Sequence, residues 1–136
     1  MYRYFFQAAG LLLLPFAAYA APLIVLDPGH TPSQGGALGV RGQYEVVYND
    51  RIAAELKTAL EADGWQVAVT RKPAEERTLA ERAGMANQAK ADIFLSLHHD
   101  SAQPQYLQKI QVSGKEAYQT LRPISGYSLF VSGENP

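Results

Sequence analysis

Short apolar runs recur along this chain and predict its strands. The run at 23–26 is continuous, which is typical of a strand buried in a parallel sheet. The run at 65–70 alternates and is rich in β-branched and aromatic residues, and the run at 93–97 is again apolar. A fourth run, at 126–131, predicts one more strand close to Pro136.

Helical periodicity fills the two intervals between the first three runs. Residues 45–63 repeat apolar side chains at four-residue spacing, and Gly64 follows where a glycine commonly ends a helix. Residues 78–90 open with Thr-Leu-Ala-Glu, the pattern of a capping box. The order strand, helix, strand, helix, strand predicts an α/β fold with a largely parallel central sheet flanked by helices and right-handed crossovers.

Two segments lack such periodicity and are expected to be loops. Residues 31–42 contain a proline and four glycines. Residues 101–125 are polar and rich in glutamine. Because the chain ends shortly after the fourth predicted strand with no closing helix, we expect the fold to be incomplete at its C-terminal end.

The first 20 residues predict a signal peptide rather than part of the fold. One arginine precedes a short apolar stretch, and Ala18-Tyr-Ala20 has the A-x-A form of a cleavage site. The alternative, a membrane anchor, is less favoured because the stretch is shorter than the ~20 residues of a spanning helix and contains Pro15. We therefore expect residues 21–136 to be exported to the periplasm or cell wall, with no stable membrane anchor after cleavage.

Composition narrows the chemistry of the remaining chain. A length of 136 residues allows one domain. With 12 Lys+Arg, 13 Asp+Glu and no basic run, nucleic-acid binding is not expected. Cysteine is absent, which excludes a cysteine nucleophile and a thiolate zinc site, so any metal must be held by carboxylates and the 3 histidines.

Two histidines follow predicted strands directly. His30 follows the first strand and His98 the third, and the carboxyl ends of parallel strands meet at one edge of a sheet. Glu45 stands at the predicted start of the first helix. Two imidazoles and one carboxylate form a ligand set for catalytic zinc, with a fourth position left for water or substrate. The alternatives are structural histidines and a carboxylate favoured by the helix dipole.

Three further polar residues are candidates for orienting such ligands. Asn49 lies one helical turn after Glu45, and His99 and Asp100 follow His98. His99 points away from His98 if the strand continues, so it is expected to be an orienting or surface residue rather than a ligand. The alternatives, that Asp100 is a turn residue and that Asn49 belongs to a polar helix face, are at least as well supported as these orienting roles.

At these positions the sequence resembles the zinc-dependent N-acetylmuramoyl-L-alanine amidases of the Amidase_3 type. The resemblance makes His30, Glu45 and His98 zinc ligands. It implies hydrolysis of the amide bond between the lactyl group of N-acetylmuramic acid and the L-alanine of the peptidoglycan stem peptide. The matching segments, in order, are 26–30, the glycine-rich 35–42 with Glu45 and Asn49, 70–71, Leu79, Arg82, 86–87, 91–92, 94–98 and 126–131.

The resemblance also sets limits on this chain. The family has another metal-binding histidine after the last matched strand and a catalytic glutamate on a final strand, and both positions lie beyond Pro136. Residues 21–136 are therefore expected to be the N-terminal portion of a catalytic domain, nearly inactive alone, and the catalytic residue is unknown. The alternative is a non-catalytic cell-wall or metal-binding protein on the same scaffold. Activator proteins are compatible with both, but no sequence feature indicates one.

Overall fold

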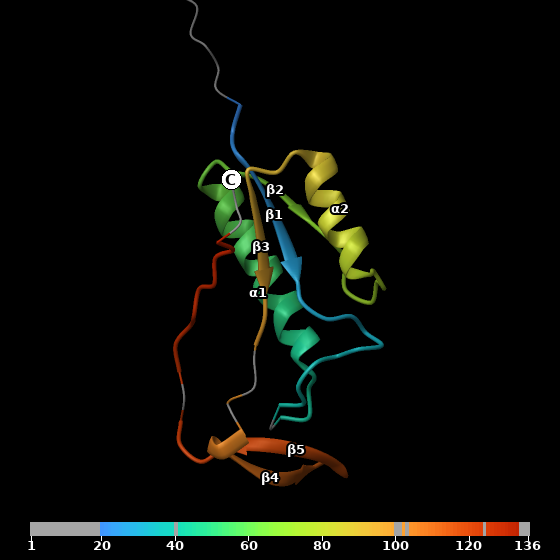
Figure 1. Ribbon diagram of the computed structural model, residues 1–136, viewed down its shortest axis with the longest axis vertical. Helices are drawn as coiled ribbons and strands as arrows, with labels where there is room; N and C mark the ends of the chain where they lie inside the picture. The colour runs from blue at the N-terminus through green and yellow to red at the C-terminus, as the bar shows by residue number, and fades with distance from the viewer. Residues whose placement is uncertain (1–19, 40, 100–101, 103, 124, 134–136) are drawn as a thin grey trace, which may run out of the picture.

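A three-stranded parallel sheet forms the centre of the molecule in the computed structural model, which describes residues 20–39, 41–99, 102, 104–123 and 125–133. Its strands are β1 (Leu23–Pro28), β2 (Gln66–Val69) and β3 (Ile93–Leu97), in the order β2-β1-β3 (Figure 1). Leu26 of β1 pairs with Val69 on one side and with Leu95 on the other. This arrangement confirms the predicted α/β class.

The continuous apolar run of β1 forms the core because strands flank it on both sides. Ile24, Val25 and Leu26 are buried, and Leu26 has no exposed surface. Burying one such side chain contributes roughly 1.5–3 kcal/mol. The central strand is therefore the most strongly fixed part of the sheet, and its carboxyl end is a rigid place to carry a functional residue.

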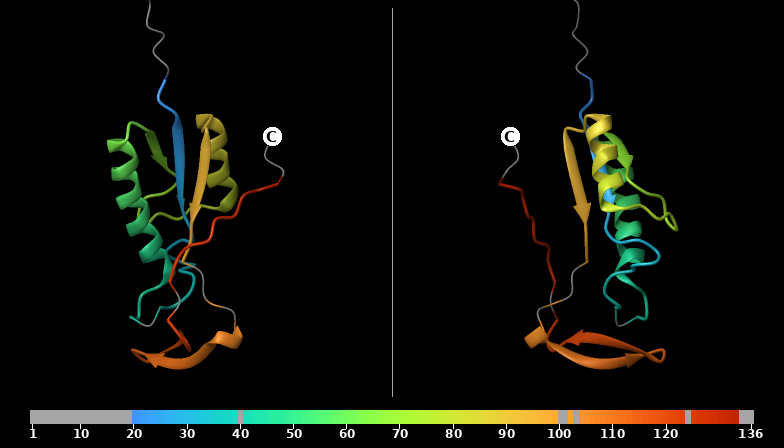
Figure 2. Two further views of the ribbon diagram at one scale, coloured as in Figure 1. Left: turned by 90° about the vertical axis from the view of Figure 1, so that its left-hand side faces the viewer. Right: turned by 45° about the vertical axis from the view of Figure 1, so that its right-hand side comes forward.

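Two helices connect the strands, close to their predicted bounds. Helix α1 (Glu45–Ala62) packs along β1 and β2, and α2 (Leu79–Ala89) leads into β3. In the left view of Figure 2 the strands lie between the two helices. The predicted capping box is present: the Thr78 hydroxyl accepts the Glu81 N–H, and the Glu81 carboxylate accepts the Thr78 N–H at 2.7 Å.

A buried polar network joins these elements just before the strands end. One oxygen of the Asp27 carboxylate accepts the Thr70 hydroxyl at 2.7 Å and the Arg82 guanidinium at 3.1 Å. The other accepts the Ser96 hydroxyl at 2.9 Å. Since these partners follow β2 or lie on α2 and β3, a single carboxylate holds four elements in register.

The prediction of an unstructured loop over 101–125 was wrong. Within it lie a short 3₁₀ turn (Pro104–Tyr106) and an antiparallel hairpin of β4 (Leu107–Val112) and β5 (Lys115–Thr120). The hairpin turns at Ser113 and Gly114, which both have positive φ, as the type I′ turn of a two-residue hairpin requires. It lies beyond the carboxyl ends of the parallel strands (Figure 1), where Lys115 approaches the Tyr44 ring.

The predicted strand at 126–131 was also wrong. The described residues there have no regular structure, and Tyr127 and Phe130 are 97% and 86% exposed. A β-strand requires a neighbouring edge to hydrogen-bond, and an apolar sequence alone does not provide one.

The N-terminal prediction falls mostly outside the described part of the chain, because residues 1–19 of the expected signal segment are not described. Among the described residues, no helix has the length and hydropathy needed to cross a membrane.

Candidate metal centre

Three side chains meet at the carboxyl edge of the sheet. His30 follows β1, His98 follows β3, and Glu45 is the first residue of α1. Nε2 of His30 lies 3.1 Å from Oε2 of Glu45, and Nδ1 of His98 lies 3.0 Å from its Oε1. The ligand atoms of the three residues all lie within 4.8 Å of one another. The structure therefore brings together the three residues that the sequence singled out.

The carboxylate of Glu45 is the most buried member of the cluster, with 5% of its surface exposed. Its two oxygens accept the backbone N–H groups of His99 at 2.8 Å and Ala37 at 3.3 Å. Burial raises the pKa of Glu45, but these N–H groups and the neighbouring imidazoles of His30 and His98 outweigh it, so the pKa lies below the ordinary 4.5. Glu45 is therefore a carboxylate at neutral pH.

The two imidazoles are more accessible than the carboxylate. The side chains of His30 and His98 are 29% and 41% exposed, and their rings meet edge to face with centroids 4.9 Å apart. His30 adopts the left-handed backbone conformation, with φ 66°. That conformation costs a residue with a side chain roughly 1–2 kcal/mol, so the surroundings must hold it in place.

Two glycines make room for the imidazoles. A Cβ atom on Gly29 would lie 2.4 Å from the His98 ring. A Cβ atom on Gly36, which has φ 77°, would lie 2.6 Å from Cδ2 of His30 and 2.7 Å from Oε2 of Glu45. The glycine-rich loop thus lets the backbone approach the cluster closely. The loop was predicted from the sequence but this role was not; the available signals were Gly29 directly before His30 and Gly36 six residues after it.

The structure places His99 and Asn49 beside the cluster. Nδ1 of His99 lies 2.7 Å from Oδ1 of Asn49, and the Asn49 amide donates to the Gly29 carbonyl at 3.1 Å. Because β3 ends at Leu97, the alternation of a strand does not apply, and His98 and His99 both reach α1. Asp100, the other candidate for orienting ligands, lies outside the described residues.

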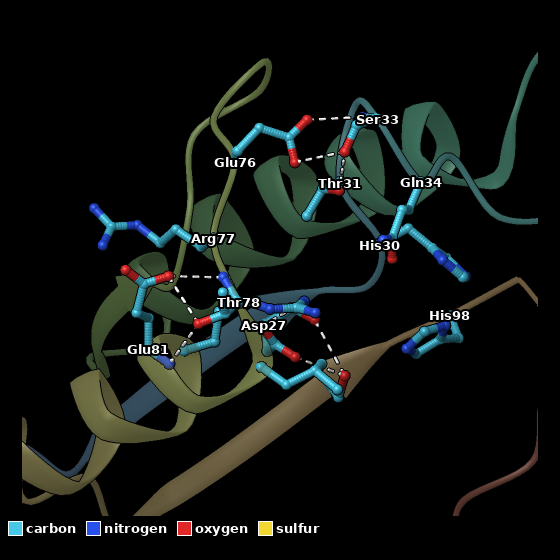
Figure 3. A pocket seen from close by; sticks show the side chains of 13 residues that line it. Asp27, His30, Thr31, Ser33, Gln34, Glu76, Arg77, Thr78, Glu81 and His98 are labelled. Atoms are coloured by element: carbon cyan, nitrogen blue, oxygen red, sulfur yellow. Dashed lines mark hydrogen bonds and ion pairs between the residues drawn. The ribbon is translucent and has the colours of Figure 1, made fainter.

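A cavity of about 580 Å³, lined mainly by polar and charged residues, opens beside the two imidazoles. Figure 3 shows His30 and His98 at one side of it and Glu76, Arg77 and Glu81 at the other. Glu45 does not line the cavity; it contacts the two imidazoles that do. The remaining lining residues are Asp27, Thr31, Ser33, Gln34, Thr78, Leu79, Arg82 and Ser96.

The donor set suits a zinc ion. Two imidazole nitrogens and one buried carboxylate oxygen lie within 4.8 Å of one another, and zinc binds this combination of ligands in catalytic sites. Hydrogen bonds to the carboxylate from His99 and Ala37 are of the kind that orient a metal ligand.

Comparison with known proteins agrees with this architecture. The profile of the N-acetylmuramoyl-L-alanine amidase family matches residues 24–131, which is most of the chain. The chain is 38% identical over 80 residues to the N-acetylmuramoyl-L-alanine amidase AmiC of Neisseria meningitidis, covering 59% of this chain and 19% of that protein. It is 38% identical over 84 residues to the N-acetylmuramoyl-L-alanine amidase LytC of Bacillus subtilis, covering 60% of this chain and 17% of that protein.

Solved structures show the same likeness. An N-acetylmuramoyl-L-alanine amidase from Clostridium difficile 630 superposes with a TM-score of 0.60 at 28% identity, covering 67% of this chain and 50% of that chain. The catalytic domain of the amidase CwlV from Bacillus (Paenibacillus) polymyxa gives a TM-score of 0.56 at 30% identity, covering 60% of this chain and 46% of that chain.

The fold and the cluster thus define an α/β domain with a candidate metal centre at the carboxyl edge of its parallel sheet. The chain belongs to the N-acetylmuramoyl-L-alanine amidase family. It spans about a fifth of the length of the curated relatives above and about half of the solved chains.

Proposed function

We propose that His30, Glu45 and His98 hold a zinc ion. The observation that carries this proposal is the convergence of two imidazole nitrogens on the two oxygens of one buried carboxylate, at 3.1 and 3.0 Å. The three residues come from three different elements, so their meeting is a property of the fold rather than of local sequence.

The charge and hydrogen bonding of Glu45 suit a bound cation. Glu45 stays ionised because backbone N–H groups hold its charge, and it leaves one negative charge between two imidazoles. Zinc held in this way would polarise a carbonyl oxygen and lower the pKa of a bound water toward ~7. Asn49 and His99 hydrogen-bond each other next to the ligands, and we propose that they orient Glu45 and His98 rather than bind metal.

We further propose that the protein carrying this chain is a peptidoglycan amidase. The bond it would cleave joins the lactyl group of N-acetylmuramic acid to the L-alanine of the stem peptide. Membership of the amidase family supports this, as do the named activities of the relatives. Such a substrate lies outside the cytoplasmic membrane, which fits the proposal that residues 1–20 direct export. We assign no catalytic acid or base within this chain.

The cavity beside the imidazoles is a suitable place for a peptide substrate. Its walls carry side chains of both charges and hydroxyl groups that can hydrogen-bond peptide N–H and C=O groups. Because His30 and His98 stand at its edge, a scissile amide bound in the cavity would lie next to the proposed metal.

Metal content tests the first proposal. Purified protein dialysed against zinc should contain one zinc ion per chain, and affinity can be measured by competition with a chromophoric chelator. His98→Ala should weaken binding by more than the ~10–100-fold typical of a residue that only hydrogen-bonds a ligand, and His99→Ala by no more than that. If His99→Ala abolishes zinc binding and His98→Ala does not, then His99 and not His98 is the ligand, and the proposal is wrong.

Product analysis tests the second proposal. Labelled sacculi are incubated with the protein that carries this chain, and released fragments are examined by mass spectrometry. An amidase frees stem peptides with an L-alanine amino terminus, and a chelator should stop their release. Cuts within the glycan strand would overturn the assignment, and binding of sacculi without any cleavage would instead favour a non-catalytic cell-wall protein.

A further inference from the structure

Arg71 is the largest fully buried side chain among the described residues, and nothing in the proposed metal chemistry uses it. It lies two residues after β2, with 2% of its surface exposed. A buried guanidinium needs several hydrogen-bond acceptors and a counter-charge to offset its loss of water. Its partners therefore show what it is doing there.

Those partners are three consecutive backbone carbonyls at the end of β1. Nε of Arg71 donates to the carbonyls of Pro28 at 3.1 Å and His30 at 2.8 Å, and Nη2 donates to the carbonyl of Gly29 at 3.1 Å. The planar guanidinium thus clasps the turn in which the chain leaves the central strand. This turn carries the first proposed zinc ligand.

These hydrogen bonds from Arg71 stabilise a turn whose backbone conformation is intrinsically unfavourable. His30 has φ 66°, a conformation that a residue with a side chain adopts only when its surroundings impose it. In this conformation the Pro28, Gly29 and His30 carbonyls all accept from Arg71. Without it Pro28 would keep the Arg82 donor and Gly29 the Asn49 donor, but the His30 carbonyl would lose its 2.8 Å bond. The hydrogen bonds of Arg71 therefore offset the energetic cost of the left-handed conformation of His30. In that conformation the His30 imidazole lies 3.1 Å from the Glu45 carboxylate.

Asp50 provides the negative charge that pairs with the buried Arg71 guanidinium. Its Oδ1 lies 2.7 Å from Nη2 of Arg71, and the Asp50 side chain is 17% exposed. The oxygen makes no aligned hydrogen bond among the described residues, so the contact is an ion pair. Asp50 lies in α1 five residues after Glu45, so the helix that supplies the carboxylate ligand also anchors the guanidinium that holds the histidine ligand.

We propose that Arg71 is a positioning residue of the metal centre, which holds the Pro28-Gly29-His30 turn in the conformation that points His30 at the metal. The inference rests on the proposed zinc site. Lysine cannot replace arginine here, because a single ammonium group lacks the planar fork that reaches successive carbonyls.

Arg82 provides a matched control. It is also a buried arginine, with 5% exposure, and it also donates to the carbonyl of Pro28, at 3.2 Å. Its other partner is Asp27, and among the described residues it donates to neither Gly29 nor His30. Removing Arg82 should therefore destabilise the fold without releasing the histidine turn.

The experiment compares wild-type protein with Arg71→Lys, Arg71→Met, Arg82→Lys and Arg82→Met. Zinc affinity is measured by chelator competition, the visible absorption of the cobalt-substituted protein reports ligand geometry, and the thermal midpoint of the metal-free protein reports stability. We expect both Arg71 variants to lose ~10–100-fold in zinc affinity and to change the cobalt spectrum, whereas the Arg82 variants lose less than ~3-fold at a similar loss of stability.

Each outcome decides a different question. If wild-type protein binds no zinc, the proposed metal site fails, and this inference with it. If wild-type protein binds zinc and the Arg71 and Arg82 variants weaken binding equally, the site stands but the positioning role is overturned. If Arg71→Met does not fold, Arg71→Lys and Asp50→Asn decide. Carbon chemical shifts of His30 in the metal-free protein should leave the left-handed range in these two variants, and unchanged shifts would overturn the inference.

Discussion

The carboxylate of Glu45 accepts the backbone N–H of His99 at 2.8 Å, across 54 residues of sequence. This bond joins the first turn of α1 to the chain that leaves β3. Because His98 and His99 are adjacent, the same carboxylate both faces the His98 imidazole and fixes the backbone that carries it. The bond thus helps to fix the geometry of the cluster, and ligands held in a fixed geometry lose less conformational freedom when they bind a metal.

Replacing Gly36 with alanine should weaken metal binding without a comparable loss of fold. The new Cβ would lie 2.6 Å from the His30 ring and 2.7 Å from Oε2 of Glu45, so it would push the two apart. Gly64→Ala is the matched control, because Gly64 also has positive φ but has open space around its Cβ position. Chelator competition should show zinc affinity reduced at least ~10-fold by Gly36→Ala and unchanged by Gly64→Ala. Equal affinities in the two variants would contradict the close-packing argument.

Glu45 should make the stability of the metal-free protein depend on acid pH. Its folded-state pKa lies below the ordinary value of 4.5, so the ionised carboxylate favours the folded state at pH values above 4.5. That contribution is lost as pH falls from 4.5 through the lowered folded-state value. The difference in free energy of unfolding between wild type and Glu45→Gln should therefore shrink over this interval.

Urea denaturation at successive pH values measures the difference. Glu55→Gln, on the exposed side of α1, removes the same charge away from the cluster and is the control. A difference between wild type and Glu45→Gln that stays constant from neutral to acid pH would show that the native state gives the carboxylate no preference for its ionised form.

The capping box should support α2 and, through it, the start of β3. Thr78→Ala removes the hydroxyl that accepts the Glu81 N–H and should lower the free energy of unfolding by about 1 kcal/mol. Thr58→Ala is the control, since Thr58 lies inside α1 and its hydroxyl bonds only the Ala54 carbonyl. Urea denaturation of both variants tests this, and a larger loss for Thr58→Ala would contradict it.

The core of the fold could be predicted from sequence because its signals are local and strong. The apolar run of β1, the four-residue periodicity of α1 and the Thr78 capping box each specify one element without reference to the rest of the chain. The three candidate ligands followed from the same reasoning, because parallel strands carry their carboxyl ends to one edge.

The secondary structure of the β4–β5 hairpin and of the segment 126–131 was not predicted correctly from the sequence pattern. In β4 and β5 the less exposed apolar residues do not recur every two positions, so hydrophobicity gave no strand period. The Ser113-Gly114 dipeptide was nevertheless a usable turn signal. At 126–131 the opposite error arose: an apolar alternation favours a strand but does not supply a partner edge. The role of Arg71 depends on three carbonyls distant in sequence, and no local pattern encodes that contact.

The central claim is that His30, Glu45 and His98 hold one zinc ion. The most direct test is a crystal of the zinc-loaded protein measured at the zinc absorption edge, where anomalous scattering locates the ion. We expect a single anomalous peak within ~2.0–2.2 Å of Nε2 of His30, a carboxylate oxygen of Glu45 and Nδ1 of His98. No peak at this position, or a peak coordinated by His99 in place of His98, would contradict it.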